Sequence, residues 1–370
     1  MTMDVRAGQR GQRALVIYSA ASGRARQLPR ALSSLQQAGV EVLQVMAIAE
    51  LHGLPAQGSN WLAQGVDILI AAGGDGVIGG AINHIADCGL PLGIMPLGTS
   101  NDIARSLSIP LDMSSAARTL VEGQTRHIDL AAVDAFDPSR TAGTLLLEGA
   151  APAYGYFAHV LTIGLNVHFA QIATNVATRR RYGRLTYPIA AFEALRNPEI
   201  MPVHLQFEGL QLPPRAHRLY QADRAGGVEY AQLSVRALQV SIINAPIFGG
   251  AWQITLPGSS LDDSVLDVVV FEEFGSSQLS ARLATFFNSP PLSAARPEED
   301  EAAARFFGHP AELSGLPGIH HLQARGIAIS TENDPQPATL DGEIRGRTPL
   351  CVKLLKDFLP IRVPAGTTAS

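Results

Sequence analysis

The chain has 370 residues, of which 46% are hydrophobic and 16% charged, with a formal net charge of −5 and two cysteines. This length predicts two domains with cores of their own, and two distant cysteines argue against a disulfide framework or a cysteine-based zinc cluster, so we expect a cytoplasmic protein. The net charge argues against a general nucleic-acid binder, and no apolar run reaches the roughly 18 residues of a membrane-spanning helix.

The first half of the chain alternates apolar strands with amphipathic helices. Strands are predicted at 14–19, 40–46, 66–72 and 93–97. A first helix carries Leu28, Leu32 and Leu35 on one face. A second carries apolar residues at helical spacing, namely Ile78, Ala81, Ile82, Ile85 and Ala86. This alternation predicts a parallel sheet covered by helices on both faces, with ligands at the carboxyl ends of its strands.

The second half is richer in strands. Strands are predicted at 144–147, 157–163, 238–243 and 265–271, with one helix at about 187–195 and an exposed proline-rich and acidic excursion at 288–301. A last strand, at about 350–355, is expected to return to the first domain. We therefore expect an unstructured segment 1–12, an α/β domain at 13–131, a β-sandwich domain at 132–349 and a returning strand with a tail at 350–370.

Two glycine-containing loops follow neighbouring strands of the first half. The sequence GGDG occupies 73–76, between an apolar strand and a helix, and PLGTSND occupies 96–102 after the next strand. Glycines let backbone N–H groups approach an anion closely, and both loops are expected at the same edge of the sheet. A third small-residue loop contributes Ser22 and Gly23. Singly, the first loop reads as a tight turn, and the second as a helix capped by Thr99 or Ser100. Together the three loops predict a phosphate cradle.

These motifs resemble the diacylglycerol kinase catalytic-domain superfamily, in the bacterial lipid kinase branch that is related to sphingosine kinases. The resemblance rests on GGDG at 73–76, PLGTSND at 96–102, Ile128-Asp129-Leu130, and Asp341-Gly342-Glu343. It extends over nearly the whole chain. It implies an N-terminal α/β domain like that of phosphofructokinase and NAD kinase, and a C-terminal β-sandwich.

The resemblance also implies an ATP- and Mg²⁺-dependent kinase that phosphorylates a hydroxyl of a diacylglycerol-, sphingoid- or phosphatidylglycerol-like lipid. The expected nucleotide-binding residues are Ser22, Gly23, Gly73, Gly74, Asp75, Gly76, Val77, Gly98, Thr99, Asn101 and Asp102. The family pattern places Mg²⁺ on the Asp263 side chain and the carbonyls of Ser260 and Val265. Glu343 is the expected general base, supported by Asp341. Asp75 either orients its loop or reaches the metal.

Several residues depart from the family pattern. Val77 replaces a threonine, Gly79-Gly80 replaces an Asn-Glu pair, and Ser264 replaces a glycine of the metal turn. The lost hydrogen bond at Val77 is worth roughly 1.5–3 kcal/mol where the partner is charged. These departures keep two alternatives open, a catalytically weak lipid-binding or regulatory homologue and an NAD-kinase-like enzyme with a soluble substrate.

Contact with a membrane is predicted from a basic cluster at 179–184. Arg179, Arg180, Arg181 and Arg184 stand together in a chain of negative net charge. Basic residues near an anionic surface contribute about 1 kcal/mol each. We expect a cytoplasmic protein that visits the inner face of the membrane, with ATP and a lipid as partners, no nucleic acid, and a homodimer as the assembly considered. His320 and His321 lack metal-ligand spacing and are interpreted as ordinary histidines.

Overall fold

The computed structural model describes residues 11–20, 24–138, 151–174, 193–194, 198–211, 223–225, 228–248, 254–256, 258–273, 319–332 and 334–367. The chain divides into two compact units. Unit 1 comprises 1–128 and 357–369, and unit 2 comprises 129–356. Of the predicted features, Ser22, Gly23, the strand at 144–147, the arginine cluster and the segment 288–301 lie outside the described residues.

Unit 1 is built on parallel strands. Its sheet runs β2 (Val40–Ala47), β1 (Gln12–Tyr18), β3 (Ile68–Gly73), β4 (Leu92–Pro96), and then the end of β18 (Leu350–Val363). β1 begins at Gln12, inside the segment predicted to be unstructured. β3 and β4 are buried along their whole length, as expected for strands covered on both faces.

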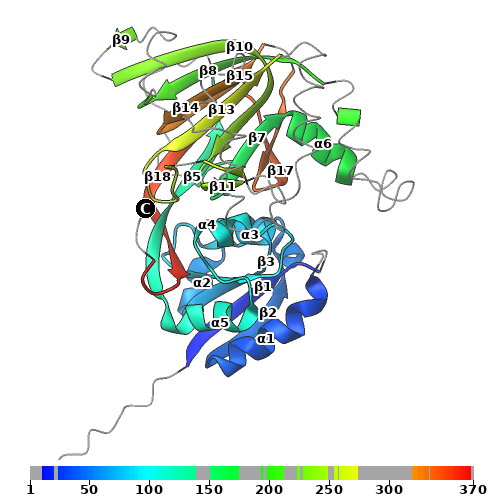
Figure 1. Ribbon diagram of the computed structural model, residues 1–370, viewed down its shortest axis with the longest axis vertical. Coiled ribbons are helices and arrows are strands. Elements are labelled where there is room, and N and C mark those ends of the chain that lie inside the picture. Colours follow the sequence, from blue (N-terminus) through cyan, green and yellow to red (C-terminus); the bar gives the residue numbers. More distant parts are fainter. Residues whose placement is uncertain are drawn as a thin grey trace, which may run out of the picture. The chain divides into compact units, whose positions relative to one another are not determined.

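Helices cover both faces of this sheet (Figure 1). α1 (Leu28–Gln37) packs with α5 (Met113–Glu122), whereas α2 (Gly58–Ala63) packs with α3 (Asp75–Ile85). α4 (Asp102–Ser106) follows β4. In the sheet, β2 lies on one side of the neighbouring strands β1 and β3, and β4 lies on the other side. The connection from β1 to β2 and the connection from β3 to β4 therefore run in opposite directions across the sheet. The loops after β1 and β3 therefore flank a topological switch point, where open α/β sheets bind ligands.

Unit 2 consists of antiparallel strands arranged around one long strand, β10 (Val228–Ile243). The first half of β10 pairs with β8 (Met201–Glu208), and its second half lies between β7 (Val160–Gly164) and β13 (Leu266–Glu272). On the side of β8, the next strands in the sheet are β15 (Gly326–Thr331) and then β18. On the side of β7, they are β16 (Pro337–Leu340) and then β17 (Glu343–Arg347). β14 (Ile319–Ala324) pairs with β13.

The remaining elements complete the two units. β5 (Gln124–Ala135) leads from unit 1 into unit 2 and pairs with β18 and with β6 (Gly155–Phe157). Short elements are η1 (Ala25–Gln27), η2 (Ile48–Leu51), β9 (Asp223–Ala225), β11 (Ile247–Phe248) and β12 (Ile254–Thr255). The core of unit 2 consists of apolar side chains from its strands, including Phe157, Phe207, Leu161, Val240 and Val268.

The structure differs from the predicted elements at several places. The strand expected at 157–163 is two strands, β6 and β7, interrupted at Ala158 and His159. α6 (Leu165–Thr174) follows β7 and was not predicted, because its apolar residues do not form a clear stripe. The expected last strand is also longer, since β18 continues to Val363 and pairs with β4 at Ile361.

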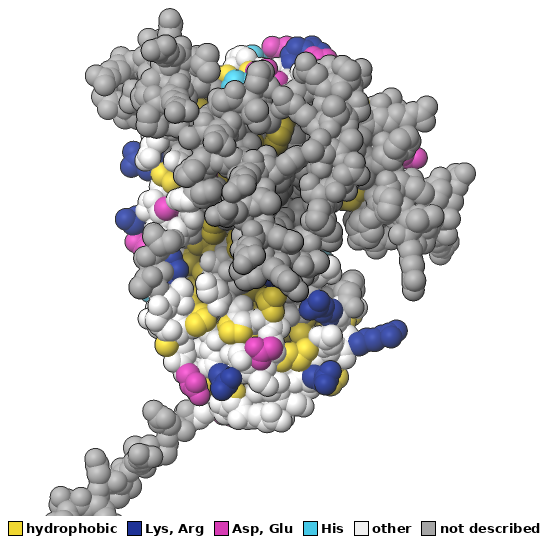
Figure 2. Space-filling model, in the orientation of Figure 1, with side chains coloured by type: hydrophobic (Ala, Val, Ile, Leu, Met, Phe, Trp, Pro, Cys, Tyr) yellow, Lys and Arg dark blue, Asp and Glu magenta, His cyan; other side chains and the backbone are white. Residues whose placement is uncertain are grey.

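On the part of unit 1 that Figure 2 shows, charged side chains of both signs are interspersed with apolar ones. Exposed large apolar residues on the described part of the chain are scattered and include Leu43 and Val45 on the edge strand β2. Among the described residues, no helix has the length and apolar character needed to cross a membrane.

Candidate functional site

The two predicted glycine loops of unit 1 lie in direct contact. A Cβ atom added to Gly98 would lie 2.4 Å from the Cα of Gly74, and Leu97 N–H donates to the Gly73 carbonyl over 2.9 Å. Only glycine at these positions lets the backbones approach this closely. The structure thus brings GGDG and PLGTSND together at the carboxyl ends of β3 and β4.

Asp75 connects the two loops. Its carboxylate accepts the backbone N–H groups of Ile103 over 2.9 Å and of Asp102 over 3.2 Å, at the first turn of α4. The predicted cap by Thr99 or Ser100 is wrong, because the N-cap residue is Asn101, in a left-handed conformation with φ 54°, and it makes no side-chain cap. Of the two roles considered for Asp75, this geometry supports orientation of the loop.

The second loop is closed from within. The Asn101 side chain accepts from Gly98 N–H over 2.8 Å and donates to the Gly98 carbonyl over 3.1 Å. Asn101 and Asp102 are both buried, whereas Thr99 is exposed. Val77 is also buried, and its side chain fills the space beside Gly73. Among these residues, Thr99 is the side chain placed at the surface of the loop.

In unit 2, Asp263 closes a turn between Ser260 and Val265. It accepts Ser260 N–H over 2.8 Å and Val265 N–H over 3.0 Å. Ser264, at the position of the family glycine, keeps the left-handed conformation with φ 65°. We call residues 260–265 the acid turn.

Asp129 holds this turn from β5. Its carboxylate accepts Ser264 N–H over 2.8 Å, and its own N–H donates to the Leu261 carbonyl over 2.7 Å. The pKa of Asp263 is raised to about 6, chiefly by burial and in smaller part by the negative charges of Asp267 and Asp129, while the two backbone donors oppose the rise. The acid turn therefore lies where a cation would relieve repulsion between carboxylates.

The two acids of Asp341-Gly342-Glu343 have different surroundings. The buried Asp341 carboxylate accepts the N–H groups of Ala158, His159 and Val160 over 3.0, 2.9 and 3.1 Å. Burial raises the pKa of Asp341, while His159 and these donors oppose the rise. The Glu343 side chain is 41% exposed, and its Oε2 lies 3.7 Å from Arg345 Nε, within reach of charge attraction but too far for a hydrogen bond.

Asn244 connects these two parts of unit 2. Its side-chain amide donates to the carbonyls of Asp129 and Ala158, each over 3.0 Å. It therefore joins the strand that holds the acid turn to the segment that Asp341 anchors. This role of Asn244 cannot be predicted from the sequence, because a lone asparagine after a strand carries no signal. Asp129 was expected only as part of the motif Ile128-Asp129-Leu130.

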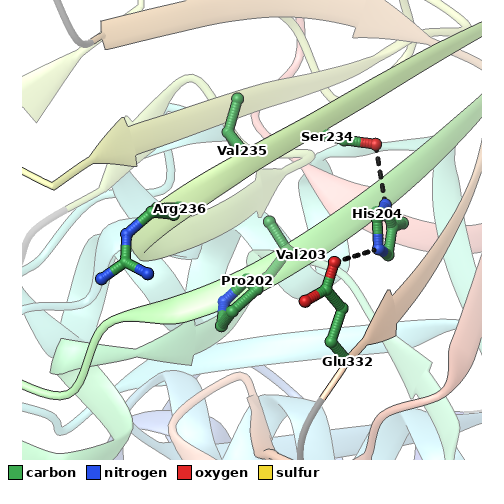
Figure 3. A pocket seen from close by; sticks show the side chains of 7 residues that line it. All are labelled: Pro202, Val203, His204, Ser234, Val235, Arg236 and Glu332. Carbon is green, nitrogen blue, oxygen red and sulfur yellow. Dashed lines mark hydrogen bonds and ion pairs between the residues drawn. The ribbon is translucent and has the colours of Figure 1, made fainter.

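A hollow of about 300 Å³ lies elsewhere on unit 2 and is lined by Pro202, Val203, His204, Ser234, Val235, Arg236 and Glu332. His204 lies between Ser234 and Glu332, with its ring nitrogens 2.7 and 3.1 Å from their oxygens (Figure 3). Arg236 is paired with Glu273 over 2.7 Å. None of the predicted site residues lines this hollow.

Comparison with known proteins assigns both halves of the chain. Residues 13–133 match the diacylglycerol kinase catalytic domain, and residues 159–291 match the YegS C-terminal NAD kinase beta sandwich-like domain. The two-domain fold predicted from the sequence is confirmed by these matches.

Relatives match along almost the whole chain. A Staphylococcus saprophyticus protein named diacylglycerol kinase is 25% identical over 95% of this chain and 96% of its own length. A Staphylococcus aureus protein of the same name is 24% identical over 95% of this chain and 93% of its own. A solved structure of a diacylglycerol kinase from Bacillus anthracis, 18% identical, covers 97% of this chain and 99% of that one with a TM-score of 0.56, which shows the shared fold. The chain belongs to the diacylglycerol kinase catalytic-domain superfamily.

Proposed function

We propose that this protein is an ATP- and Mg²⁺-dependent lipid kinase. The acceptor would be a hydroxyl of a diacylglycerol-, sphingoid- or phosphatidylglycerol-like lipid. The observation that carries the proposal is the contact between the two glycine loops at Gly74 and Gly98, beside the switch point of a parallel sheet. Backbone-rich loops at such a point suit the phosphates of a nucleotide.

In unit 1, the loops would bind the phosphates of ATP. Thr99 offers an exposed hydroxyl on the second loop, and Asp75 fixes the position of that loop through the first turn of α4. Asn101 maintains the loop's shape through both of its bonds to Gly98. In this assignment Asp75 and Asn101 position the phosphate-binding backbone, and Thr99 contacts ATP.

In unit 2, the acid turn would hold the cation. Its residues fit Mg²⁺, because carboxylate and carbonyl oxygens are the ligands that this ion prefers. The half-buried Asp263 is already crowded by two further carboxylates, which is the setting that a cation stabilises. Among the described residues, no three His, Cys, Asp or Glu side chains form a group that could hold a metal. The expected donors, Asp263 with the carbonyls of Ser260 and Val265, do not require such a group. When bound, Mg²⁺ neutralises phosphate charge during transfer.

Glu343 would accept the proton of the lipid hydroxyl. The hydroxyl oxygen forms a bond to the γ-phosphorus, the bond between this phosphorus and the β,γ-bridging oxygen breaks, and ADP leaves. The proton passes to the Glu343 carboxylate, which is exposed enough to meet a substrate. Asp341 has its carboxylate occupied by backbone donors, so it supports Glu343 by fixing the turn.

The experiment is a transfer assay with radiolabelled ATP, Mg²⁺ and a panel of diacylglycerol, phosphatidylglycerol, sphingoid bases, ceramide and NAD. Label in one lipid is expected, and it should fall by at least 100-fold in Glu343→Gln. His204→Ala, in the hollow of Figure 3, is the matched control and should retain the wild-type rate. Label in NAD would overturn the lipid assignment, and full turnover in folded Glu343→Gln would overturn the role of this residue.

The arginine cluster at 179–184 is proposed to bring the enzyme to anionic lipid. Flotation with phosphatidylglycerol vesicles should recover the wild-type chain and lose the variant in which Arg179, Arg180, Arg181 and Arg184 are replaced by glutamine. Added salt should weaken the same binding, because surface electrostatic attraction is screened. Equal recovery of both proteins would contradict the proposed surface.

A second candidate, a lipid-binding homologue with weak catalysis, is favoured by one observation. Val77 is buried against Gly73 and offers no hydroxyl where the family has threonine. Vesicle binding without label in any acceptor would support this candidate. A gain of at least 10-fold in transfer on Val77→Thr would locate the weakness at this position.

A further inference from the structure

A buried carboxylate outside the expected donor set lies on β13. Asp267 is 1% exposed, and its Oδ1 accepts from two side chains of β14, His321 Nε2 over 2.8 Å and Gln323 Nε2 over 2.9 Å. His321 is itself 3% exposed. Asp267 lies directly opposite Gln323 in the β13–β14 ladder. Both donors therefore converge on the same oxygen and fix the orientation of the carboxylate.

The other oxygen of this carboxylate is left without a partner. Asp267 Oδ2 is buried, and it accepts no hydrogen bond from the residues that the structure describes. A buried carboxylate oxygen without a partner is energetically costly, and such groups in folded proteins point to an ion or a water molecule.

The charge of Asp267 reaches the acid turn. It is one of the two neighbouring carboxylates that raise the pKa of Asp263, and the other is Asp129. Asp267 follows the acid turn by two residues, at the start of β13, so its place is fixed by the same backbone. An oriented carboxylate with one oxygen unused thus stands beside the expected cation ligand.

We propose that Asp267 is a positioning residue of the cation site, and that its Oδ2 accepts a hydrogen bond from water bound to the cation. The proposal rests on the proposed function, because it takes the acid turn as the cation site. Mg²⁺ loses its waters reluctantly, so several of its ligands in proteins are water molecules that need acceptors nearby. Residues that hold such outer ligands commonly change metal affinity by 10- to 100-fold. His321 and Gln323 then serve to keep Oδ2 directed away from β14.

The neighbouring pair His320 and Glu272 provides a matched comparison. His320 Nε2 lies 2.6 Å from Glu272 Oε1, between the same two strands, but both side chains are partly exposed, at 20% and 37%. This pair also joins a histidine to a carboxylate. It differs in being partly exposed, and neither oxygen of Glu272 is among the buried atoms without a partner in the described residues. If the pair of His321 and Asp267 were only structural, its loss should affect cation binding no more than the loss of the pair of His320 and Glu272.

The test measures Mn²⁺ binding to the full chain by electron paramagnetic resonance, without nucleotide or lipid. Asp267→Asn is the central variant, because its amide oxygen can still accept from His321 and Gln323 while an uncharged NH₂ group replaces Oδ2. We expect its Mn²⁺ affinity to fall by about 10- to 100-fold. Glu272→Gln should bind as the wild type does, and Asp263→Asn should lose binding.

The histidine is tested separately. His321→Leu removes one of the two donors and should weaken Mn²⁺ binding, whereas His321→Gln supplies a new donor of similar reach and should restore it. Circular dichroism confirms that each variant is folded. Unchanged Mn²⁺ affinity in folded Asp267→Asn would overturn this inference and leave the kinase proposal intact. Equal Mn²⁺ binding by wild type and Asp263→Asn would show that the acid turn is not the cation site. That result would overturn this inference and the cation site of the proposed function together.

Discussion

Asp341 and Glu343 stand two residues apart, yet their carboxylates have different surroundings. The Asp341 carboxylate receives backbone N–H groups from residues 181 to 183 positions away. The Glu343 carboxylate is partly exposed and receives no hydrogen bond from the described residues. The turn therefore holds one carboxylate fixed by backbone donors and one that is open to a substrate, as the proposed roles require.

Substitution should separate these functions. Asp341→Ala leaves buried N–H groups of three residues without acceptors and is expected to lower the free energy of unfolding by about 3 kcal/mol or more. Glu343→Gln should change it by less than about 0.5 kcal/mol, as for other surface substitutions. Urea unfolding measures both. A strongly destabilised Glu343→Gln would mean that its effect on transfer reports folding.

Ser264 shows how the acid turn tolerates the loss of the family glycine. Its φ of 65° is in the left-handed region, which costs a non-glycine residue roughly 1–2 kcal/mol. Ser264→Gly is therefore expected to stabilise unit 2 by about 0.5–1 kcal/mol, after the greater flexibility of glycine in the unfolded chain is deducted. Thermal unfolding measures the change.

Ser108, with φ 55° in unit 1, is the matched position for this prediction. Ser108→Gly should give a similar gain in stability with no effect on Mn²⁺ binding. If Ser264→Gly destabilised the chain while Ser108→Gly stabilised it, the serine side chain at 264 would have a role that its backbone conformation does not explain.

At the scale of elements, β3, α3, β4 and α4 are joined through loops that touch at Gly74 and Gly98, the contact that carries the proposed phosphate site. Gly98→Ala would place a Cβ against the Gly74 backbone, so we expect at least a 10-fold loss of ATP affinity by calorimetry. Gly80→Ala, within α3, meets only the side chain of Ile48 and should be tolerated. Undiminished ATP binding by Gly98→Ala would move the nucleotide site away from these loops.

The start of α5 gives a prediction that depends on pH. Asp112 is its N-cap and accepts Ser115 N–H over 2.9 Å, which lowers the pKa of the Asp112 carboxyl below its usual 3.8. A lowered pKa contributes stability above the unfolded value and loses it as pH falls through the folded one. Asp112→Ala should cost about 1 kcal/mol at pH 7.

Acid titration checks this assignment. The difference between Asp112→Ala and wild type, measured by urea unfolding, should shrink as pH falls below about 3.8, the usual value for the group. A difference that stayed constant through this range would show that the carboxylate charge does not contribute to the cap.

At the scale of the whole molecule, the end of the chain completes the fold of its beginning. Leu359, Ile361 and Val363 of β18 are fully buried, and this part of the strand belongs to unit 1. Arg362 secures it by donating to the carbonyls of Leu120, Val121 and Gly123, at the end of α5. Unit 1 is thus discontinuous in sequence, and the buried residues within 359–363 are part of its core.

Arg362→Ala should therefore destabilise unit 1 by about 1–3 kcal/mol, because three carbonyls lose a charged donor. Lys356→Ala, an exposed position on the same strand, is the control and should be neutral. Hydrogen exchange of the amides of α5 and β4 would locate the effect. Equal protection in both variants would show that the returning strand does not depend on this anchor.

The sequence by itself determined the elements and motifs whose signals are local. The apolar residues predicted for one face of α3 are buried. Apolar residues that recur about every 3.6 positions lie on one face of a helix, and this face packs against the core. The glycine loops were found in the same way, because glycine marks backbone that approaches closely or turns sharply. The resemblance of these motifs indicated the superfamily that the comparisons show.

Only the tertiary structure decided how distant residues combine. It assigned Asp75 to the first turn of α4, Asn244 to the carbonyls of Asp129 and Ala158, and His321 to Asp267. It also divided the expected strand at 157–163, where three N–H groups turn to Asp341. Each of these is a single hydrogen-bonding residue whose partner lies far along the chain. Such a residue leaves no periodic pattern, so its partner is fixed only when the strands come together.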